Sequence, residues 1–295
     1  WIASQDFTQD ITLSDKILGN AGEAYRLFRN TFRYQLSTQF DFNIEQDGVA
    51  IADLDTLDRW ALHQTAALAT ACTEAYDAYE LHRVYQLCNN FCSVTLSSIY
   101  HDILKDRLYT LAADHPLRRS SQTAIHHIFH TLVRLLAPII SFTTDEAWAH
   151  ATTGTDFTDD PIHLQDWPTP PADWSDATIE SEFATLLEVR GQVTEAIEPA
   201  RQAGKIGKSL DAAVTLNFPT GSDALAILEK HREFLPELFI VSHVALAAGE
   251  GDSSIAVQHC EELGYTRCPR CWRWVPALNS TPQGDVCPRC TEALN

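Results

Sequence analysis

Residues 268–290 read CPRCWRWVPALNSTPQGDVCPRC, and this stretch contains the tetrapeptide Cys-Pro-Arg-Cys twice. Its two C-x2-C pairs are separated by 15 residues, a spacing that is typical of zinc sites. Each pair forms a tight turn, and two such turns supply the four corners of a tetrahedron. We therefore predict one zinc ion, held by Cys268, Cys271, Cys287 and Cys290.

The predicted zinc ion is structural, because four sulfur ligands leave no coordination position for water or a substrate. Two redox-active C-x-x-C motifs, or disulfide bonds, are the alternative interpretations. Zinc is favoured because no βαβ pattern surrounds either pair. Cys72, Cys88 and Cys92 lie in predicted helices, where we expect them to be small core residues.

Aromatic and basic side chains alternate beside the first cysteine pair. Arg270 lies inside the pair, and Trp272 and Trp274 flank Arg273. Side chains of this kind on a rigid loop suit stacking on unpaired bases together with phosphate contacts. An alternative is that one Trp fills the small core of the zinc module, and we expect this of Trp274.

A small α/β unit is predicted upstream of the zinc module. The predicted elements are a helix at 176–203, a strand at 212–218, a helix at 223–235 and a second strand at 238–247. Residues 151–175 lack periodicity and contain four prolines, which indicates a linker or surface loop.

Long amphipathic helices with short links are predicted further upstream, at residues 12–37, 53–78, 79–112 and 119–150. Such helices form bundles. The expected caps are Thr12 with Asp15, Asp53, and Ser120, and Pro138 is expected to kink the last helix. The chain is thus predicted to be mainly α-helical, with a helical bundle over 1–170, a small α/β domain over 171–257 and a four-cysteine zinc finger of short hairpins over 258–295.

The chain has 295 residues and a formal net charge of −19. No apolar stretch approaches the roughly 18 residues that a membrane-spanning helix needs, so no membrane partner is predicted. Zinc-binding cysteine pairs suit a reducing compartment, and we expect the cytoplasm. Because the chain begins with Trp1 and contains no Met, we interpret it as a fragment of a longer protein.

Although the chain is acidic overall, its basic side chains are clustered in a few short segments. Arg26, Arg29, Asn30 and Arg33 follow the spacing i, i+3, i+4 and i+7, which places them on one face of the first predicted helix. This arginine row can bind an anion even on an acidic chain. The alternative is an ordinary solvated helix face.

His126, His127 and His130 superficially resemble a zinc-protease helix. That motif needs a Glu directly after its first His, and His127 occupies this position. We therefore interpret the three histidines as packed or solvated helix residues.

Gly207-Lys208-Ser209 resembles the end of a phosphate loop. The Gly that the motif requires earlier is replaced by Gln202, and no strand precedes it, so we predict no nucleotide site there. Lys205 and Lys208 still suit contacts with a backbone phosphate.

Several segments together carry a family resemblance: Trp1–Phe7, Arg29–Tyr34, Leu57–Trp60, Tyr79–Tyr85, Asn90–Ser93, Tyr100–Tyr109, Leu136–Ile139, Thr144–Trp148 and Cys268–Trp272. They resemble bacterial isoleucyl-tRNA synthetase, a class I aminoacyl-tRNA synthetase, along almost the whole chain. The valine and leucine enzymes share the helical part more loosely, and the terminal zinc finger favours the isoleucine enzyme.

The resemblance implies the C-terminal part of an isoleucine--tRNA ligase, with a helical anticodon-binding domain, a junction domain and a zinc finger. The family's ATP-binding signatures, His-x-Gly-His and Lys-Met-Ser-Lys-Ser, are absent from these residues, so the chain is expected to hold no catalytic residue. ATP would bind only in a catalytic domain outside this chain. The implied partner is the anticodon stem-loop of tRNA(Ile), bound by a monomer.

Carried over residue by residue, the resemblance places the arginine row against the anticodon stem-loop. It also places Arg270 and Trp272 at the anticodon bases, and further candidate RNA contacts are Arg273, Lys205 and Lys208. Thr12 and Leu27 depart from the family, which often has basic residues at both positions.

Two other classes of protein stay open on the residues alone. One is a non-catalytic RNA- or DNA-binding protein with a zinc finger, and the other is a scaffold whose helices bind protein. A similar finger ends the DNA glycosylases that excise oxidised bases, but those enzymes need a catalytic N-terminal Pro or Glu, and this chain begins with Trp1. Binding to anticodon stem-loops would separate these classes.

Overall fold

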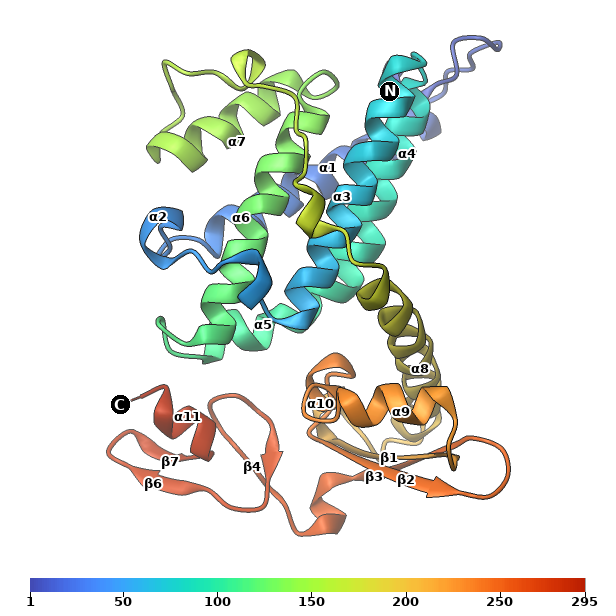
Figure 1. Cartoon of the computed structure of the whole chain (residues 1–295), viewed down its shortest axis with the longest axis vertical. Coiled ribbons are helices and arrows are strands. Elements are labelled where there is room, and N and C mark those ends of the chain that lie inside the picture. The colour runs from blue at the N-terminus through green and yellow to red at the C-terminus, as the bar shows by residue number, and fades with distance from the viewer. Residues whose placement is uncertain (295) are drawn as a thin grey trace. The chain divides into compact units, whose positions relative to one another are not determined.

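The structure is a computed structural model that describes residues 1–294, and the chain divides into two compact units. Unit 1 comprises Trp1–Leu104 and Ala113–Asp176, and unit 2 comprises Lys105–Ala112 and Ala177–Asn295. Figure 1 labels the elements of both units.

Unit 1 is built from helices. Its elements are η1 (Ile2–Ser4), α1 (Asp15–Ser37), α2 (Ile44–Asp47), η2 (Ile51–Asp53), α3 (Thr56–Asp77), α4 (Leu81–Asn90), the π-helical stretch η3 (Phe91–Tyr100), the start of α5 (His101–Thr110), α6 (Pro116–Leu136), α7 (Ser141–Thr153), η4 (Ile162–Leu164) and η5 (Ala172–Trp174). The mainly α-helical class is confirmed, and Figure 1 shows the long helices side by side.

The core of unit 1 lies among α1, α3, α4 and α6. The rings of Phe32 and Phe129 meet edge to face with their centroids 5.8 Å apart, joining α1 to α6. Cys72, Cys88 and Cys92 are fully buried, which confirms them as core residues.

A buried carboxylate adds a polar contact to this core. Asp58 is fully buried and accepts hydrogen bonds from the hydroxyls of Tyr100 at 2.6 Å, Ser120 at 2.6 Å and Ser121 at 3.1 Å. Burying a carboxylate is costly unless such donors replace its water. Asp58 therefore ties α3 to the end of η3 and to α6.

The structure corrects three predicted helix caps. The observed caps are Ser14 for α1, Asp55 for α3 and His115 for α6, in place of Thr12, Asp53 and Ser120. Ser120 lies inside α6, where its hydroxyl donates to Asp58 and accepts from the backbone N–H of Asp55 in place of capping its own helix. Several residues near the start of each helix can act as its N-cap. The set of side chains that the helix buries determines which of them does so.

The predicted helix at 119–150 is two helices. α6 ends at Leu136 and α7 begins at Ser141, so Pro138 ends the helix instead of kinking it. Proline lacks an N–H and its ring clashes with the preceding turn. The predicted helix at 79–112, in contrast, is a continuous helical run from α4 through η3 to α5.

Unit 2 contains a three-stranded sheet in the order β2-β1-β3. The central strand β1 (Ala212–Pro219) pairs in parallel with β2 (His243–Gly249) and antiparallel with β3 (Ser254–His259). The helices α8 (Ala177–Gln202) and α9 (Asp223–Lys230) pack against this sheet.

Part of this α/β unit differs from the prediction. The strand predicted at 238–247 begins only at His243, because α10 (Leu235–Leu238) is followed by a turn in which Ile240 has a φ of 54°. The predicted helix at 223–235 ends at Lys230, and β3 was not predicted. β3 alternates exposed and half-buried residues, so it lacks the apolar run that identified β1.

The zinc module follows the sheet in unit 2. It contains η7 (Cys260–Leu263), a hairpin of β4 (Thr266–Arg267) and β5 (Trp274–Val275), a hairpin of β6 (Asn279–Thr281) and β7 (Gly284–Val286), and α11 (Pro288–Glu292). The predicted hairpins are confirmed.

Lys105–Ala112 belongs to unit 2 although its neighbours in sequence belong to unit 1. Arg107 is buried, and its Nε and Nη2 donate to the Glu237 carboxylate in α10 at 2.5 and 3.1 Å. A two-point arginine–carboxylate contact fixes orientation as well as position. The domain boundaries predicted at 170 and 257 stay predictions.

Among the helices of residues 1–294, none has the length and hydropathy needed to cross a membrane.

Candidate zinc and nucleic-acid site

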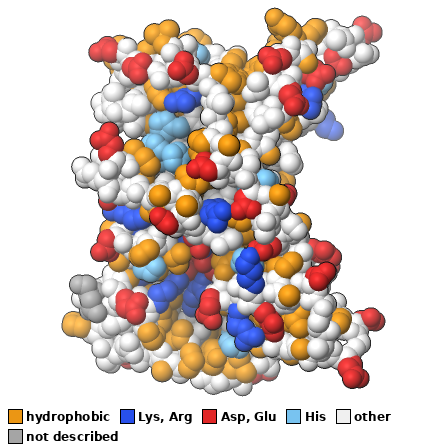
Figure 2. All heavy atoms as spheres, in the orientation of Figure 1, with side chains coloured by type: hydrophobic (Ala, Val, Ile, Leu, Met, Phe, Trp, Pro, Cys, Tyr) orange, Lys and Arg blue, Asp and Glu red, His pale blue; other side chains and the backbone are white. Residues whose placement is uncertain are grey.

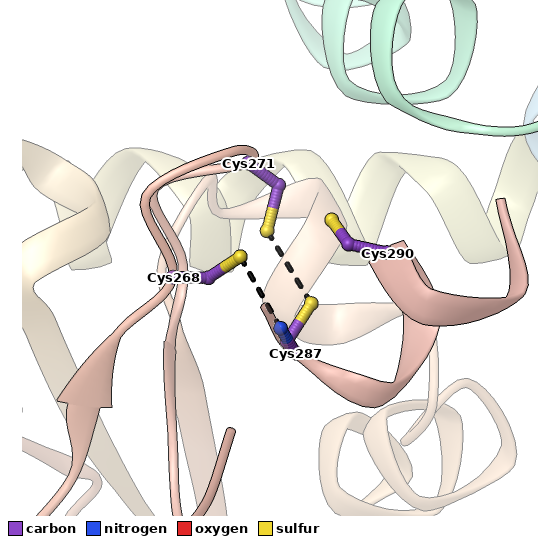
Figure 3. Close-up of side chains that lie close together, drawn as sticks. All are labelled: Cys268, Cys271, Cys287 and Cys290. Atoms are coloured by element: carbon purple, nitrogen blue, oxygen red, sulfur yellow. Dashed lines mark hydrogen bonds between the residues drawn. The ribbon is translucent and has the colours of Figure 1, made fainter. Parts of the chain in front are cut away.

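The four predicted zinc ligands lie together in unit 2. Cys268 and Cys271 come from the turn after β4, Cys287 precedes α11 and Cys290 lies within it. All four side chains are buried, their sulfur atoms lie within 4.8 Å of one another, and Figure 3 shows them turned toward one region. The sulfur atoms of Cys271 and Cys287 are 3.6 Å apart, much farther than the roughly 2 Å of a disulfide bond.

This set of donors fits a tetrahedral metal ion. Zinc–sulfur bonds of about 2.3 Å place the sulfur atoms of a tetrahedral site roughly 3.8 Å apart, which matches the observed spacing. Burial opposes ionisation of the Cys268 thiol, but hydrogen bonds from the backbone N–H groups of Cys271, Cys287 and Arg270 outweigh it and lower the pKa to about 6. The spacing and burial of the four sulfur atoms therefore fit a metal ion, although burial raises the pKa of Cys271 and Cys287.

Trp272 follows the first cysteine pair in a strained backbone conformation. Its φ is 65°, in the left-handed region that favours glycine. The turn requires this conformation, since the N–H of Trp272 donates to the Cys268 carbonyl at 2.9 Å and the N–H of Cys268 donates to the Arg273 carbonyl at 2.8 Å. A bulky residue costs roughly 1–2 kcal/mol in this conformation.

The indole of Trp272 is also exposed and lies beside two cations. Half of the residue's surface is accessible, and Lys208 Nζ and the Arg267 guanidinium carbon lie 4.4 and 5.6 Å from the ring centroid. We call Trp272, Lys208 and Arg267 the tryptophan patch. Lys205 is exposed in the same loop as Lys208, and Arg267 was not among the predicted contacts.

Arg270 and Arg273, the other predicted contacts near Trp272, have partners inside unit 2. Arg270 Nη1 donates to the Thr110 carbonyl at 2.5 Å, and Arg273 Nη2 donates to Asp106 Oδ2 at 3.2 Å. Their guanidinium groups are thus engaged by the Lys105–Ala112 segment. RNA binding by these two residues stays a prediction.

Trp274 does not fill the core of the zinc module, contrary to the prediction. The buried cluster of the module consists of the four cysteines and Val286. Trp274 Nε1 donates to Asp211 Oδ1 at 2.9 Å, and its ring lies 4.9 Å from that of His259. Trp274 therefore connects the module to the neighbouring sheet.

The arginine row lies in unit 1 and is exposed along α1. Arg26 forms an ion pair with Glu23, and both side chains are largely exposed. Within residues 1–294, Arg29 and Arg33 form no ion pair. The row therefore has two cationic side chains available to an anionic ligand.

Arg29 and Arg33 line a cavity of about 940 Å³ in unit 1, bordered by α1, α2, α6 and α7. Its lining also contains Phe40, which is 81% exposed, and Phe42. A cavity of this volume is in the range of ligand pockets. No local sequence pattern predicts this cavity, because its walls come from three separate segments, at residues 29–45, 126–130 and 143–154.

The histidines of α6 are packed, as predicted. His126 and His130 line both this cavity and a second one of about 360 Å³, and their ring centroids are 4.2 Å apart. Burial lowers the pKa of His126 to about 4 and that of His130 to about 3, and neighbouring histidines add to the effect. A patch of histidine side chains is visible on the face shown in Figure 2, among scattered acidic and basic groups.

Residues 58–216 match the family model described as the anticodon-binding domain of tRNA ligase. The whole chain is 40% identical to the isoleucine--tRNA ligase of Syntrophotalea carbinolica, 39% identical to that of Thermotoga maritima and 37% identical to that of Geobacter sulfurreducens. It spans about a third (32%) of the length of each. The resemblance to isoleucyl-tRNA synthetases is thereby confirmed, and the chain belongs to the family of anticodon-binding domains of tRNA ligases.

Proposed function

We propose that this chain is the tRNA-binding part of an isoleucine--tRNA ligase and that it holds the anticodon arm of tRNA(Ile). Activation of isoleucine with ATP and its transfer to the tRNA would take place in parts of the ligase outside this chain. One structural zinc ion occupies the four-cysteine site, and the protein acts as a monomer in the cytoplasm. Family membership and the identity to three isoleucine--tRNA ligases support this proposal.

The observation that carries the proposal is the tryptophan patch. The indole of Trp272 is exposed, and the backbone adopts a conformation that glycine would adopt more easily. Cations lie 4.4 and 5.6 Å from the ring centroid, so the ring is suited to stacking on a base. Bases in an anticodon loop are unstacked and accessible to such a ring. Lys208 and Arg267 supply positive charge for the adjoining phosphates, and Lys205 extends it.

The arginine row supplies the second contact. Arg29 and Arg33 bind phosphates of the stem, and Arg26 and Asn30 assist from the same face of α1. The aromatic lining of the neighbouring cavity, including Phe40, suits a base that has left the stack.

The selectivity of RNA binding tests this function. The chain is titrated against a labelled stem-loop with an isoleucine anticodon, the same stem with a different anticodon, and a DNA hairpin of the first sequence. We expect about tenfold or greater preference for the first RNA, because good base contacts each discriminate by roughly 1–3 kcal/mol. Equal affinity for both RNAs would contradict anticodon reading, and preference for the DNA would favour the alternative DNA-binding class.

Replacing Trp272 by Ala or by Gly is expected to weaken binding of the isoleucine stem-loop equally, by about 1–3 kcal/mol, because both variants remove the stacking surface. Their stabilities should differ. Gly relieves the left-handed strain that Ala retains, so the zinc module of Trp272→Gly should be at least as stable as that of the parent chain. Thermal unfolding and fluorescence anisotropy with the RNA check both results.

Trp167→Ala is the matched control for these variants. Trp167 is 39% exposed and donates from Nε1 to Thr73, outside both proposed RNA contacts. Its replacement should leave RNA affinity unchanged. If Trp272→Gly destabilised the module as strongly as it weakened RNA binding, Trp272 would be a packing residue and the stacking role would be wrong.

Replacing Arg29 and Arg33 together by Gln is expected to weaken binding of both RNAs in parallel and to lower the salt dependence of affinity. Each lost phosphate contact reduces the slope of log K against log [salt] by about 0.7–0.9. Lys16→Gln is the control, since Lys16 is exposed on the same helix but does not line the cavity. An unchanged slope in the double variant would exclude these phosphate contacts.

A further inference from the structure

The two Cys-Pro-Arg-Cys tetrapeptides use their arginines in the same way. Arg270 of the first pair donates from Nη1 to Cys290 Sγ at 3.4 Å, and Cys290 is the second cysteine of the other pair. The guanidinium group of Arg289 in the second pair interacts electrostatically with the sulfur of Cys271, which is the second cysteine of the first pair. Each arginine therefore reaches across to the opposite pair.

Both arginines also contact the Lys105–Ala112 segment within unit 2. Arg270 Nη1 donates to the Thr110 carbonyl at 2.5 Å. Arg289 Nη2 donates to Asp106 Oδ1 at 2.7 Å and lies 3.2 Å from Thr110 Oγ1, and Arg289 Nη1 makes a second contact with Asp106. The same two guanidinium groups thus touch the sulfur cluster on one side and this helical segment on the other.

Asp106 is the anionic centre of that contact. Its side chain is only 19% exposed and also accepts from Arg273 Nη2 at 3.2 Å. Burial opposes its ionisation, but Arg289 and Arg273 outweigh burial and hold the pKa of this carboxyl below its usual value. An Asp between two arginines is therefore charged when the module is folded.

The charge of a loaded zinc site explains why the arginines matter to the metal. One Zn²⁺ with four thiolates carries a net charge of about −2 in a buried cluster. The chain has a formal net charge of −19, so the wider protein does not offset it. Two guanidinium groups at the sulfur atoms supply the missing positive charge, and groups around a metal site set ligand orientation and affinity.

We propose that Arg270 and Arg289 are positioning residues of the zinc site that couple metal binding to docking of the Lys105–Ala112 segment. Zinc turns the sulfur atoms into thiolates, which orient the two guanidinium groups toward Asp106 and Thr110. By linkage, Asp106 holds the same guanidinium groups against the thiolates and raises zinc affinity. The inference rests on the zinc part of the proposed function and is independent of RNA binding.

Zinc affinity tests the coupling in one direction. The 295-residue chain is loaded with zinc and titrated with a chromogenic chelator. Arg270→Gln, Arg289→Gln and Asp106→Asn are expected to lose zinc about tenfold or more readily than the parent chain, a typical effect of groups around the ligands. Arg289→Lys should recover only part of the affinity, because lysine keeps the charge but not the two-point geometry. Arg232→Gln is the matched control, since Arg232 is exposed in unit 2 outside the zinc module and its replacement should leave zinc affinity within about twofold.

Hydrogen exchange tests the other direction without any substitution. Removing zinc from the parent chain should speed exchange of the Lys105–Ala112 amides, while the amides of α3 keep their protection. Unchanged exchange in Lys105–Ala112, or zinc affinity in Asp106→Asn equal to that of the parent, would overturn the coupling. A chain that bound no zinc would overturn the metal site itself, and a chain that bound zinc equally in all variants would overturn only the coupling.

Discussion

Replacing Cys290 by Ser is expected to remove most of the bound zinc and to unfold the segment from β4 to α11. The buried cluster of this module is the four cysteines and Val286, so little apolar surface remains to hold it without metal. Zinc binding contributes about 10–16 kcal/mol to folding in small four-ligand modules, and loss of one ligand forfeits a large part of it. Metal analysis after dialysis against a weak chelator and hydrogen exchange of residues 264–294 measure both effects.

Cys260→Ser is the matched control for this prediction. Cys260 is also fully buried in unit 2 but does not belong to the metal-binding group. Its variant should keep about one zinc ion per chain. A Cys290→Ser chain that retained parental zinc content and exchange rates would show that the module folds without a complete tetrahedral site.

Lowering the pH from 7 to 5 is expected to reduce the free energy of unfolding of unit 1 by about 2–4 kcal/mol through His126 and His130. An unfolded imidazole has a pKa of about 6.5. In the folded unit, burial lowers the pKa of His126 to about 4 and that of His130 to about 3. Below pH 6.5 the unfolded chain therefore binds more protons, so stability is complete above that pH and is lost as the pH falls toward the folded values.

Urea unfolding at pH 7 and pH 5 measures this loss, and a double variant isolates its cause. His126→Gln with His130→Gln removes both titrating groups and should flatten the pH dependence, even if the variant is less stable at pH 7. His163→Gln, at an exposed histidine of the same unit, should keep the parental dependence. An equally steep acid loss in the double variant would assign it to other groups, namely carboxylates or His127, whose pKa is also lowered by burial.

The grouping of the four cysteines could be predicted from the sequence because the geometry of each C-x2-C pair is local. Each cysteine pair lies in its own tight turn, which nearby residues determine. Only the distance between the two turns depends on the tertiary fold. The arginine row was readable for the same reason, since helical spacing alone puts Arg29 and Arg33 on one face. The mainly α-helical class could be predicted because the long amphipathic segments bury their apolar side chains on one face only when they are helical.

The partners of the arginines near the zinc site could not be predicted from the sequence. Arg270 meets Thr110, which is 160 residues earlier in the chain, and no local pattern specifies that contact. Residue type alone could not predict the partner of Arg270, because a guanidinium group donates to a backbone carbonyl as well as to a phosphate. The kink predicted at Pro138 was wrong, because α6 ends at Leu136 and α7 begins only at Ser141.

All eight cysteines lie within residues 1–294, are buried and form no disulfide bond, so alkylation of their sulfur atoms reports local unfolding of the protein. Cys72, Cys88 and Cys92 become accessible to an alkylating reagent only when unit 1 unfolds locally, whereas the four proposed zinc ligands would become reactive when the zinc module releases the proposed ion. Mass spectrometry of alkylated peptides can therefore time the two events separately in one sample, with no label added to the chain.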